Sequence, residues 1–69
     1  MDIVWKDGFV IRAFAKNGEV TLSANKEGML SLADILLSLA QNEPGTHIHL
    51  DEYNSLEDGS ASIIIEIIP

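Results

Sequence analysis

The chain contains no cysteine among its 69 residues. It can therefore form neither a disulfide nor a thiolate metal site, a composition that agrees with a reducing, cytoplasmic location. Its longest apolar runs, such as Ile35–Leu37 and Ile63–Ile65, are far too short to cross a bilayer. No basic segment precedes an apolar stretch at the N-terminus, so the sequence predicts no signal peptide. We expect a soluble cytoplasmic protein.

Basic side chains are also scarce. Four lysines and arginines stand against eleven acidic residues, which gives a formal net charge of −7. Nucleic acids and anionic membranes repel such a chain, whereas a basic protein attracts it. The composition thus favours a basic protein partner over direct binding to nucleic acid or membrane. The alternative is that the charge serves solubility alone.

The length of 69 residues indicates a single domain that covers residues 1–69. A chain this short buries only about 60% of the surface that it exposes when unfolded. Its core and its stability are therefore limited, and a partner is a common source of additional stability.

An Asn17-Gly18 pair between two alternating segments predicts a hairpin, because a type I′ turn needs two residues at positive φ. The strands would be Phe9–Ala15 and Glu19–Ala24, with Lys16 opposite Glu19. One face of this hairpin is wholly apolar, and we expect it to lie against the core. That face carries Ile11, Ala13, Ala15, Val20, Leu22 and Ala24. The segment Ile3–Trp5 is a candidate for a further short strand, with a turn at Asp7-Gly8.

A helix is predicted from Glu27 to Gln41, with Asn25 as its N-cap. Polar residues at spacings of three and four mark one stripe as the solvent-facing side. They are Ser31, Asp34, Ser38 and Gln41. The residues expected to pack on the sheet are Met29, Leu32, Ala33, Leu36, Leu39 and Ala40, with Leu30, Ile35 and Leu37 on the flanks. This apolar face is wide for so small a protein, and a dimer contact along one flank is the alternative to burial in the protein's own core.

Two more strands, Thr46–Tyr53 and Ala61–Ile68, follow the helix. The chain thus reads β-β-α-β-β, which predicts an α+β fold: a small antiparallel sheet of about four strands with one helix packed on one face.

Strand alternation decides where the two histidines lie. Ile48 and Leu50 should point inward, so His47, His49 and Asp51 should share the outer face, with Glu66 of the last strand nearby. A zinc site is the alternative reading, since imidazoles and carboxylates are zinc ligands. His-x-His alone is a weak signal, however, and an open sheet face does not enclose an ion. The Gly-x-Ser-x-Gly motif and a phosphate-binding loop are both lacking. We therefore expect no enzyme activity, no cofactor and no metal.

The end of the third predicted strand and the loop after it gather four acidic residues with two apolar ones. The acids are Asp51, Glu52, Glu57 and Asp58, and Tyr53 and Leu56 lie among them. Such a charged run is often only a solvated turn. An acidic patch with an aromatic anchor is also what a binder of a basic protein requires.

Several blocks of the sequence resemble those of a known family. The blocks Glu27-Gly28-Met29, the Leu/Ala-rich helix, His47–Asp51, Leu56–Ser60 and Ile63–Ile68 are similar to the pattern of the immunity protein 32 family of bacterial polymorphic toxin systems. The similarity covers residues 25–68. Met29 stands where the family usually has leucine, and Ala61-Ser62 stands where a more polar or acidic pair is expected.

The resemblance implies a non-enzymatic protein that binds and neutralises a cognate toxin, often a basic enzyme that acts on nucleic acid. The partner-binding residues expected on the open face and the acidic loop are His47, His49, Asp51, Glu52, Tyr53, Glu57, Asp58 and Glu66. Two other readings stay open. One is a self-associating module that pairs through the open sheet face or through an edge strand. The other, weaker one is a metal-binding domain.

Overall fold

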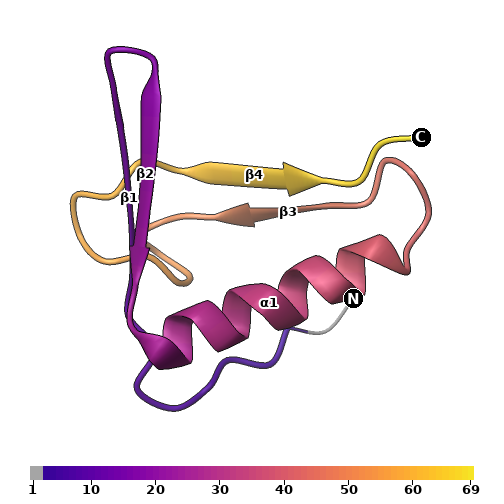
Figure 1. Cartoon of the computed structure of the whole chain (residues 1–69), viewed down its shortest axis with the longest axis horizontal. Helices are drawn as coiled ribbons and strands as arrows, with labels where there is room; N and C mark the ends of the chain where they lie inside the picture. The colour runs from indigo at the N-terminus through magenta and orange to yellow at the C-terminus, as the bar shows by residue number, and fades with distance from the viewer. Residues whose placement is uncertain (1–2) are drawn as a thin grey trace.

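The computed structural model of the chain describes residues 3–69 (Figure 1). Its elements are β1 (Ile11–Lys16), β2 (Glu19–Ala24), α1 (Lys26–Ala40), β3 (His47–Leu50) and β4 (Ile63–Glu66). The predicted α+β class and the order β-β-α-β-β are confirmed. The four strands are divided over two antiparallel sheets, β1-β2 and β3-β4, where the sequence suggested one sheet. In Figure 1 the β1-β2 hairpin stands across the start of α1, and β3-β4 runs along the helix.

The predicted register of the first hairpin is confirmed at every position, from Lys16 opposite Glu19 to Ile11 opposite Ala24. Asn17 has φ 51° and Gly18 has φ 80°, as a two-residue turn of this kind requires. The turn residues alone determine the pairing here, because a two-residue loop leaves no freedom in register.

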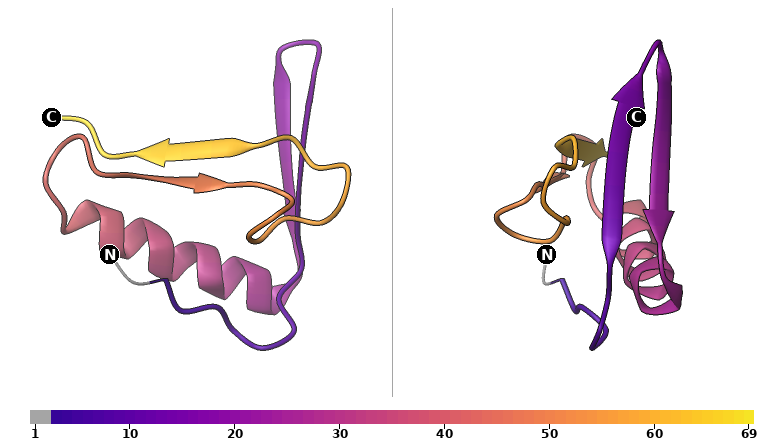
Figure 2. Two further views of the ribbon diagram at one scale, coloured as in Figure 1. Left: turned by 180° about the vertical axis from the view of Figure 1, so that it is seen from behind. Right: turned by 90° about the vertical axis from the view of Figure 1, so that its left-hand side faces the viewer.

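The expectation that the whole apolar face of this hairpin lies in the core is wrong for its outer half. Ile11 and Ala13 are buried, but Val20 is 73% and Leu22 41% exposed. Ala15 is exposed as well. The outer half of the hairpin extends beyond the other elements, so no other segment of residues 3–69 covers it (Figure 2).

The inner half of β1 is held by the chain that leads into β4. Ile11 O accepts a hydrogen bond from Glu57 N at 2.9 Å, and Ala13 O accepts one from Ala61 N at 2.8 Å. Ala13 N donates to Ser60 Oγ at 3.2 Å. These bonds join the two hairpins near the base of the first one.

The N-terminal segment lies beside the helix without forming the strand considered at Ile3–Trp5, which is irregular. Its backbone bonds to the helix, since Lys6 N donates to Ser31 Oγ at 2.9 Å. The predicted turn at Asp7-Gly8 is confirmed: Phe9 N donates to Lys6 O at 3.2 Å, and Gly8 has φ 80°. The ring of Trp5 stacks on that of Phe9 with centroids 4.7 Å apart.

Asn25 caps the helix as predicted. Its Oδ1 accepts from Gly28 N at 2.8 Å and from Val10 N at 3.0 Å, and its Nδ2 donates to Gly8 O at 2.8 Å. One side chain thus satisfies a helix N-terminal amide and two main-chain groups of the segment before β1.

The buried side of α1 is rotated from the predicted one. The residues that it buries are Gly28, Ser31, Leu32, Ile35 and Leu39. Ser31 was expected in solvent, but it is fully buried because the N-terminal segment covers it. Met29 and Leu36 were expected to pack on the sheet, but they are 49% and 53% exposed. A sheet of two strands is too narrow to cover that side of the helix.

The second hairpin places His47 opposite Glu66 and His49 opposite Ile64. Both strands are shorter than the predicted ranges Thr46–Tyr53 and Ala61–Ile68, and β3 ends where the chain turns at Asp51. The core lies between this hairpin, the helix and the base of β1. It consists of Ile11, Ala13, Leu32, Leu50 and Leu56, with Trp5, Phe9, Ala24, Ile48, Ile63 and Ile65 partly buried against it.

Candidate functional site

The outer face of the β3-β4 sheet carries both histidines, as strand alternation predicted. His47 and His49 are exposed, whereas Ile48 is half-buried and Leu50 is 1% exposed. The acidic loop follows β3 beyond the end of the sheet, beside the base of the β1-β2 hairpin (Figure 2). The histidines and the loop are therefore neighbours along the chain.

The two imidazoles contact each other edge to face, with centroids 5.1 Å apart and planes at 69°. His47 Nδ1 lies 3.1 Å from Gly45 O, so Nδ1–H donates to that carbonyl in the matching tautomer. Within residues 3–69 no group of three histidine, cysteine or acidic side chains is placed to hold a metal ion. The pair is thus exposed to water and suited to contact with another surface.

Asp51 does not join the histidine pair in its bonding. Its Oδ1 accepts from Tyr53 N at 2.9 Å and from Asn54 N at 3.1 Å. Its main-chain carbonyl accepts from Ser55 N and Leu56 N. A carboxylate that accepts from the backbone two and three residues ahead starts a tight turn. Asp51 therefore shapes the loop and holds the residues that follow it.

The other acidic residues of the loop present their charges to solvent. Glu57 and Asp58 are exposed, and so is Glu52, whose Oε2 accepts from Gly59 N at 2.7 Å across the loop. Leu56 is buried and anchors the loop to the core. Tyr53 is 95% exposed. The loop thus holds a large aromatic side chain outward among carboxylates.

Asn54 has a role that the sequence reasoning missed. Its Oδ1 accepts from Asp51 N at 3.0 Å, and its Nδ2 donates to His49 O at 2.8 Å. The side chain therefore occupies main-chain groups along the outer edge of β3. An asparagine three residues after an aspartate in a turn-rich segment is the signal that pointed to it.

The distribution of charge along the chain is the second feature that was missed. No lysine or arginine follows Lys26, whereas eight of the eleven acidic residues do. Within residues 3–69 a single ion pair forms, between Lys6 Nζ and Asp34 Oδ2 at 3.7 Å, and both side chains are about half exposed. The carboxylates of the loop and of β4 are therefore not neutralised by cations of this part of the chain.

No helix within residues 3–69 has the length and apolar character needed to span a membrane.

Comparisons with known proteins agree with the resemblance seen in residues 25–68. No curated protein and no solved structure matches the chain significantly. A family model described as immunity protein 32 matches residues 19–68, which include β2, α1, β3 and β4. This match covers well over half of the sequence, and the chain belongs to the immunity protein 32 family.

Proposed function

We propose that the protein neutralises a cognate toxin by binding it through an acidic face. This face consists of His47, His49, Asp51, Glu52, Tyr53, Glu57, Asp58 and Glu66. The toxin would carry a basic surface, as an enzyme that acts on nucleic acid does, and the acidic face would cover the part that holds phosphate. In this proposal the protein acts in the cytoplasm as a stoichiometric inhibitor and catalyses no reaction.

The absence of cations after Lys26 is the observation that carries the proposal. Unneutralised carboxylates on one side of a small protein attract a basic partner over long range and raise the association rate.

Tyr53 supplies the apolar anchor of this face. Interfaces gain much of their affinity from a few aromatic side chains, and Tyr53 is almost wholly exposed in the free protein. Its main-chain amide is held by the Asp51 carboxylate, so the segment is ordered before binding. A pre-ordered segment loses less conformational entropy when a partner binds.

The outer sheet face favours binding over catalysis. Its two imidazoles are exposed on a pair of strands, and water reaches them freely. Catalytic groups act best where the surroundings exclude water and strengthen electrostatic interactions. A flat, wet surface is better suited to contact with a second protein.

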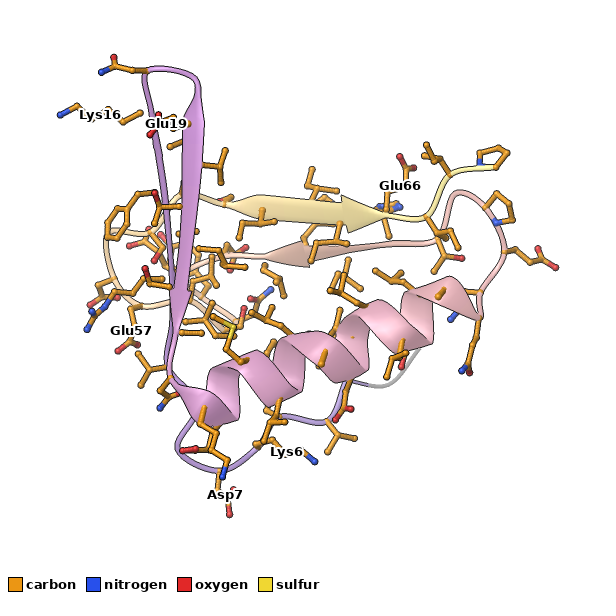
Figure 3. The ribbon with its side chains drawn as sticks, in the orientation of Figure 1. Lys6, Asp7, Lys16, Glu19, Glu57 and Glu66 are labelled. Carbon is orange, nitrogen blue, oxygen red and sulfur yellow. The ribbon has the colours of Figure 1, made fainter. Side chains whose placement is uncertain are left out.

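The test compares two charge-matched variants for binding to the cognate toxin. Glu57→Gln/Glu66→Gln removes two charges from the acidic face, and Asp7→Asn/Glu19→Gln removes two from the turn before β1 and the hairpin tip (Figure 3). Both variants change the net charge from −7 to −5. The association rate should fall about tenfold for the first variant at low salt and less than about twofold for the second.

Protection of cells that express the toxin should follow the same order. Equal losses in both variants would show that only net charge matters and would reject the acidic face. Failure of the unaltered protein to bind or to protect would reject the proposed function itself.

A further inference from the structure

Helix α1 exposes a second apolar stripe next to the one that it buries. Met29, Ala33, Leu36 and Ala40 recur at spacings of four, three and four, so they line one side of the helix. Met29 is 49% and Leu36 53% exposed, and both alanines are exposed as well. Side chains at this spacing normally lie beneath a neighbouring element.

A groove of about 310 Å³ runs between this stripe and β4. It is shallow and is lined by the apolar residues Leu36, Leu39, Ala40, Ile65, Ile67 and Ile68, with Glu66 as its one charged residue. Ile65 and Ile67 are only half-buried, so the helix covers the inner side of β4 incompletely. Apolar surface is thus left open on both walls of the groove.

The outer edge of β4 is unpaired. Residues of an antiparallel pair bond to the neighbouring strand alternately, and Ile67 N donates to Thr46 O. Ile65 and Ile63 therefore bond to β3, and the main-chain groups of Ile64 and Glu66 point away from it. β3 is the sole strand that pairs with β4 within residues 3–69. The view in Figure 1 shows this edge open above the sheet.

Glu66 is the one charged residue of β4. Exposed edges are usually blocked by lysine, proline or a bulge, and Ile63–Glu66 contains neither lysine nor proline. The outer edge of β3 differs at its end, where the Asn54 side chain donates to His49 O.

We propose that an extended segment of the toxin adds a strand to the free edge of β4. This inference rests on the proposed function and specifies how the toxin is held. Alternate side chains of the added strand would point to opposite faces. Those on the inner side would be aliphatic and enter the groove beside Leu36 and Ala40. Those on the outer side would be lysine or arginine and lie beside Glu66 and the acidic loop.

Charge complementarity selects the toxin over a second copy of this chain. The strands β2, β3 and β4 of a second copy contain no lysine or arginine to lie beside Glu66. Strand β1 does contain Arg12 and Lys16, but β2 pairs with one of its edges and residues 57–61 bond to the other. Two copies would also meet with a charge of −7 each.

The test uses the full chain and two synthetic peptides of identical composition. One alternates, acetyl-Lys-Val-Lys-Leu-Lys-Val-Lys-amide, and the other has its four lysines in one block followed by the aliphatic residues. We expect the alternating peptide to bind at least about tenfold more tightly in an NMR titration. Its largest shift changes should fall on the amides of Ile64, Glu66 and Ala40. Equal affinity for both peptides, or shifts confined to residues 51–58, would overturn the inference.

Two variants at Ile64 distinguish the contribution of its main-chain amide to binding from that of its side chain. Ile64→Pro removes an amide that points away from β3, a position where an edge strand tolerates proline. It should weaken binding of the alternating peptide at least about tenfold, whereas Ile64→Thr keeps the amide and should change the affinity less than about threefold. If Ile64→Pro disturbs the amide spectrum of β3, Leu36→Lys tests the groove without altering the edge. It places a cation in the groove from a half-exposed position and should cause a similar loss.

Two further outcomes keep this inference distinct from the proposed function. Toxin neutralisation that is equal for the unaltered protein, Ile64→Pro and Leu36→Lys would overturn added-strand binding and leave the acidic face in place. A stable homodimer in sedimentation, made monomeric by Ile64→Pro and unaffected by the peptide, would show that a second copy occupies the edge.

Discussion

Gly28 has the least space around it of the five glycines. A Cβ atom at this position would lie 2.5 Å from Val10 O and 2.9 Å from Ala24 Cβ. Its amide donates to Asn25 Oδ1, so the same residue also completes the N-cap. The missing side chain allows the first turn of α1 to lie directly against the chain that enters β1.

Gly28→Ala should therefore destabilise the protein, although alanine is the better helix former by about 1 kcal/mol. The clash with a main-chain oxygen cannot be relieved by a rotamer change, and overpacking of this kind costs about 1–3 kcal/mol. Urea unfolding of the variant and of Leu37→Ala measures the difference. Leu37 is 62% exposed on the same helix, so its loss should cost less than about 0.5 kcal/mol. A Gly28→Ala protein as stable as the original would show that the backbone moves aside without cost.

The β1-β2 hairpin joins a well-packed base to an outer half that few side chains contact. Ile11 and Ala13 are buried and bond to residues 57–61, whereas Val20, three-quarters exposed, lies beyond them. The buried part and the exposed part of this hairpin therefore belong to one continuous pair of hydrogen-bonded strands. The apolar side chains of its outer half are available for contact with another protein, since nothing within residues 3–69 covers them.

Amide hydrogen exchange should divide this hairpin into two parts. The even-numbered residues of β1 bond to β2, because Ile11 and Ala13 direct their main-chain groups to the other edge. The amide of Arg12 should exchange at least about tenfold more slowly than those of Phe14 and Lys16, because local opening is cheapest where few buried contacts must break. NMR exchange rates at neutral pH test this. Uniform protection along β1 would mean that the hairpin opens only with the rest of the fold.

With a formal charge of −7 on 69 residues, the acidic side chains repel one another, and interactions within the fold do little to offset this repulsion. The ion pair between Lys6 and Asp34 is exposed, and exposed pairs contribute little. The carboxylates are concentrated after Lys26, where no lysine or arginine counters them. A charge distribution of this kind favours association with a basic partner at the expense of the stability of the free protein.

Sodium chloride should accordingly stabilise the free protein. Raising its concentration from about 0.01 M to 0.5 M shortens the screening length from about 30 Å to below 10 Å and weakens repulsion between the exposed carboxylates. The free energy of unfolding should rise by an amount on the order of 1 kcal/mol, the sum of several weak exposed pairs. Urea unfolding at the two salt concentrations measures it. The Glu57→Gln/Glu66→Gln variant should respond less, and a decrease of stability with salt would contradict the prediction.

Features that depend on neighbouring residues were predictable from the sequence. The register of β1-β2 follows from the Asn17-Gly18 turn, and the N-cap at Asn25 follows from side-chain chemistry. The exposure of His47 and His49 follows from the alternation of a strand whose other side is apolar. The composition of the acidic face is likewise present in the sequence, and its role in toxin binding remains a prediction.

Tertiary structure decided which apolar and polar residues are covered. Ser31 is buried because the N-terminal segment lies on it, and Val20 is exposed because none of the other segments that the structure describes reaches the hairpin tip. The split into two sheets, the turn that engages Asp51, and the open groove beside β4 arise in the same way. Periodicity identifies the residues that share a side of an element. Burial depends on which distant segment packs against that side, and this depends on the path of the whole chain.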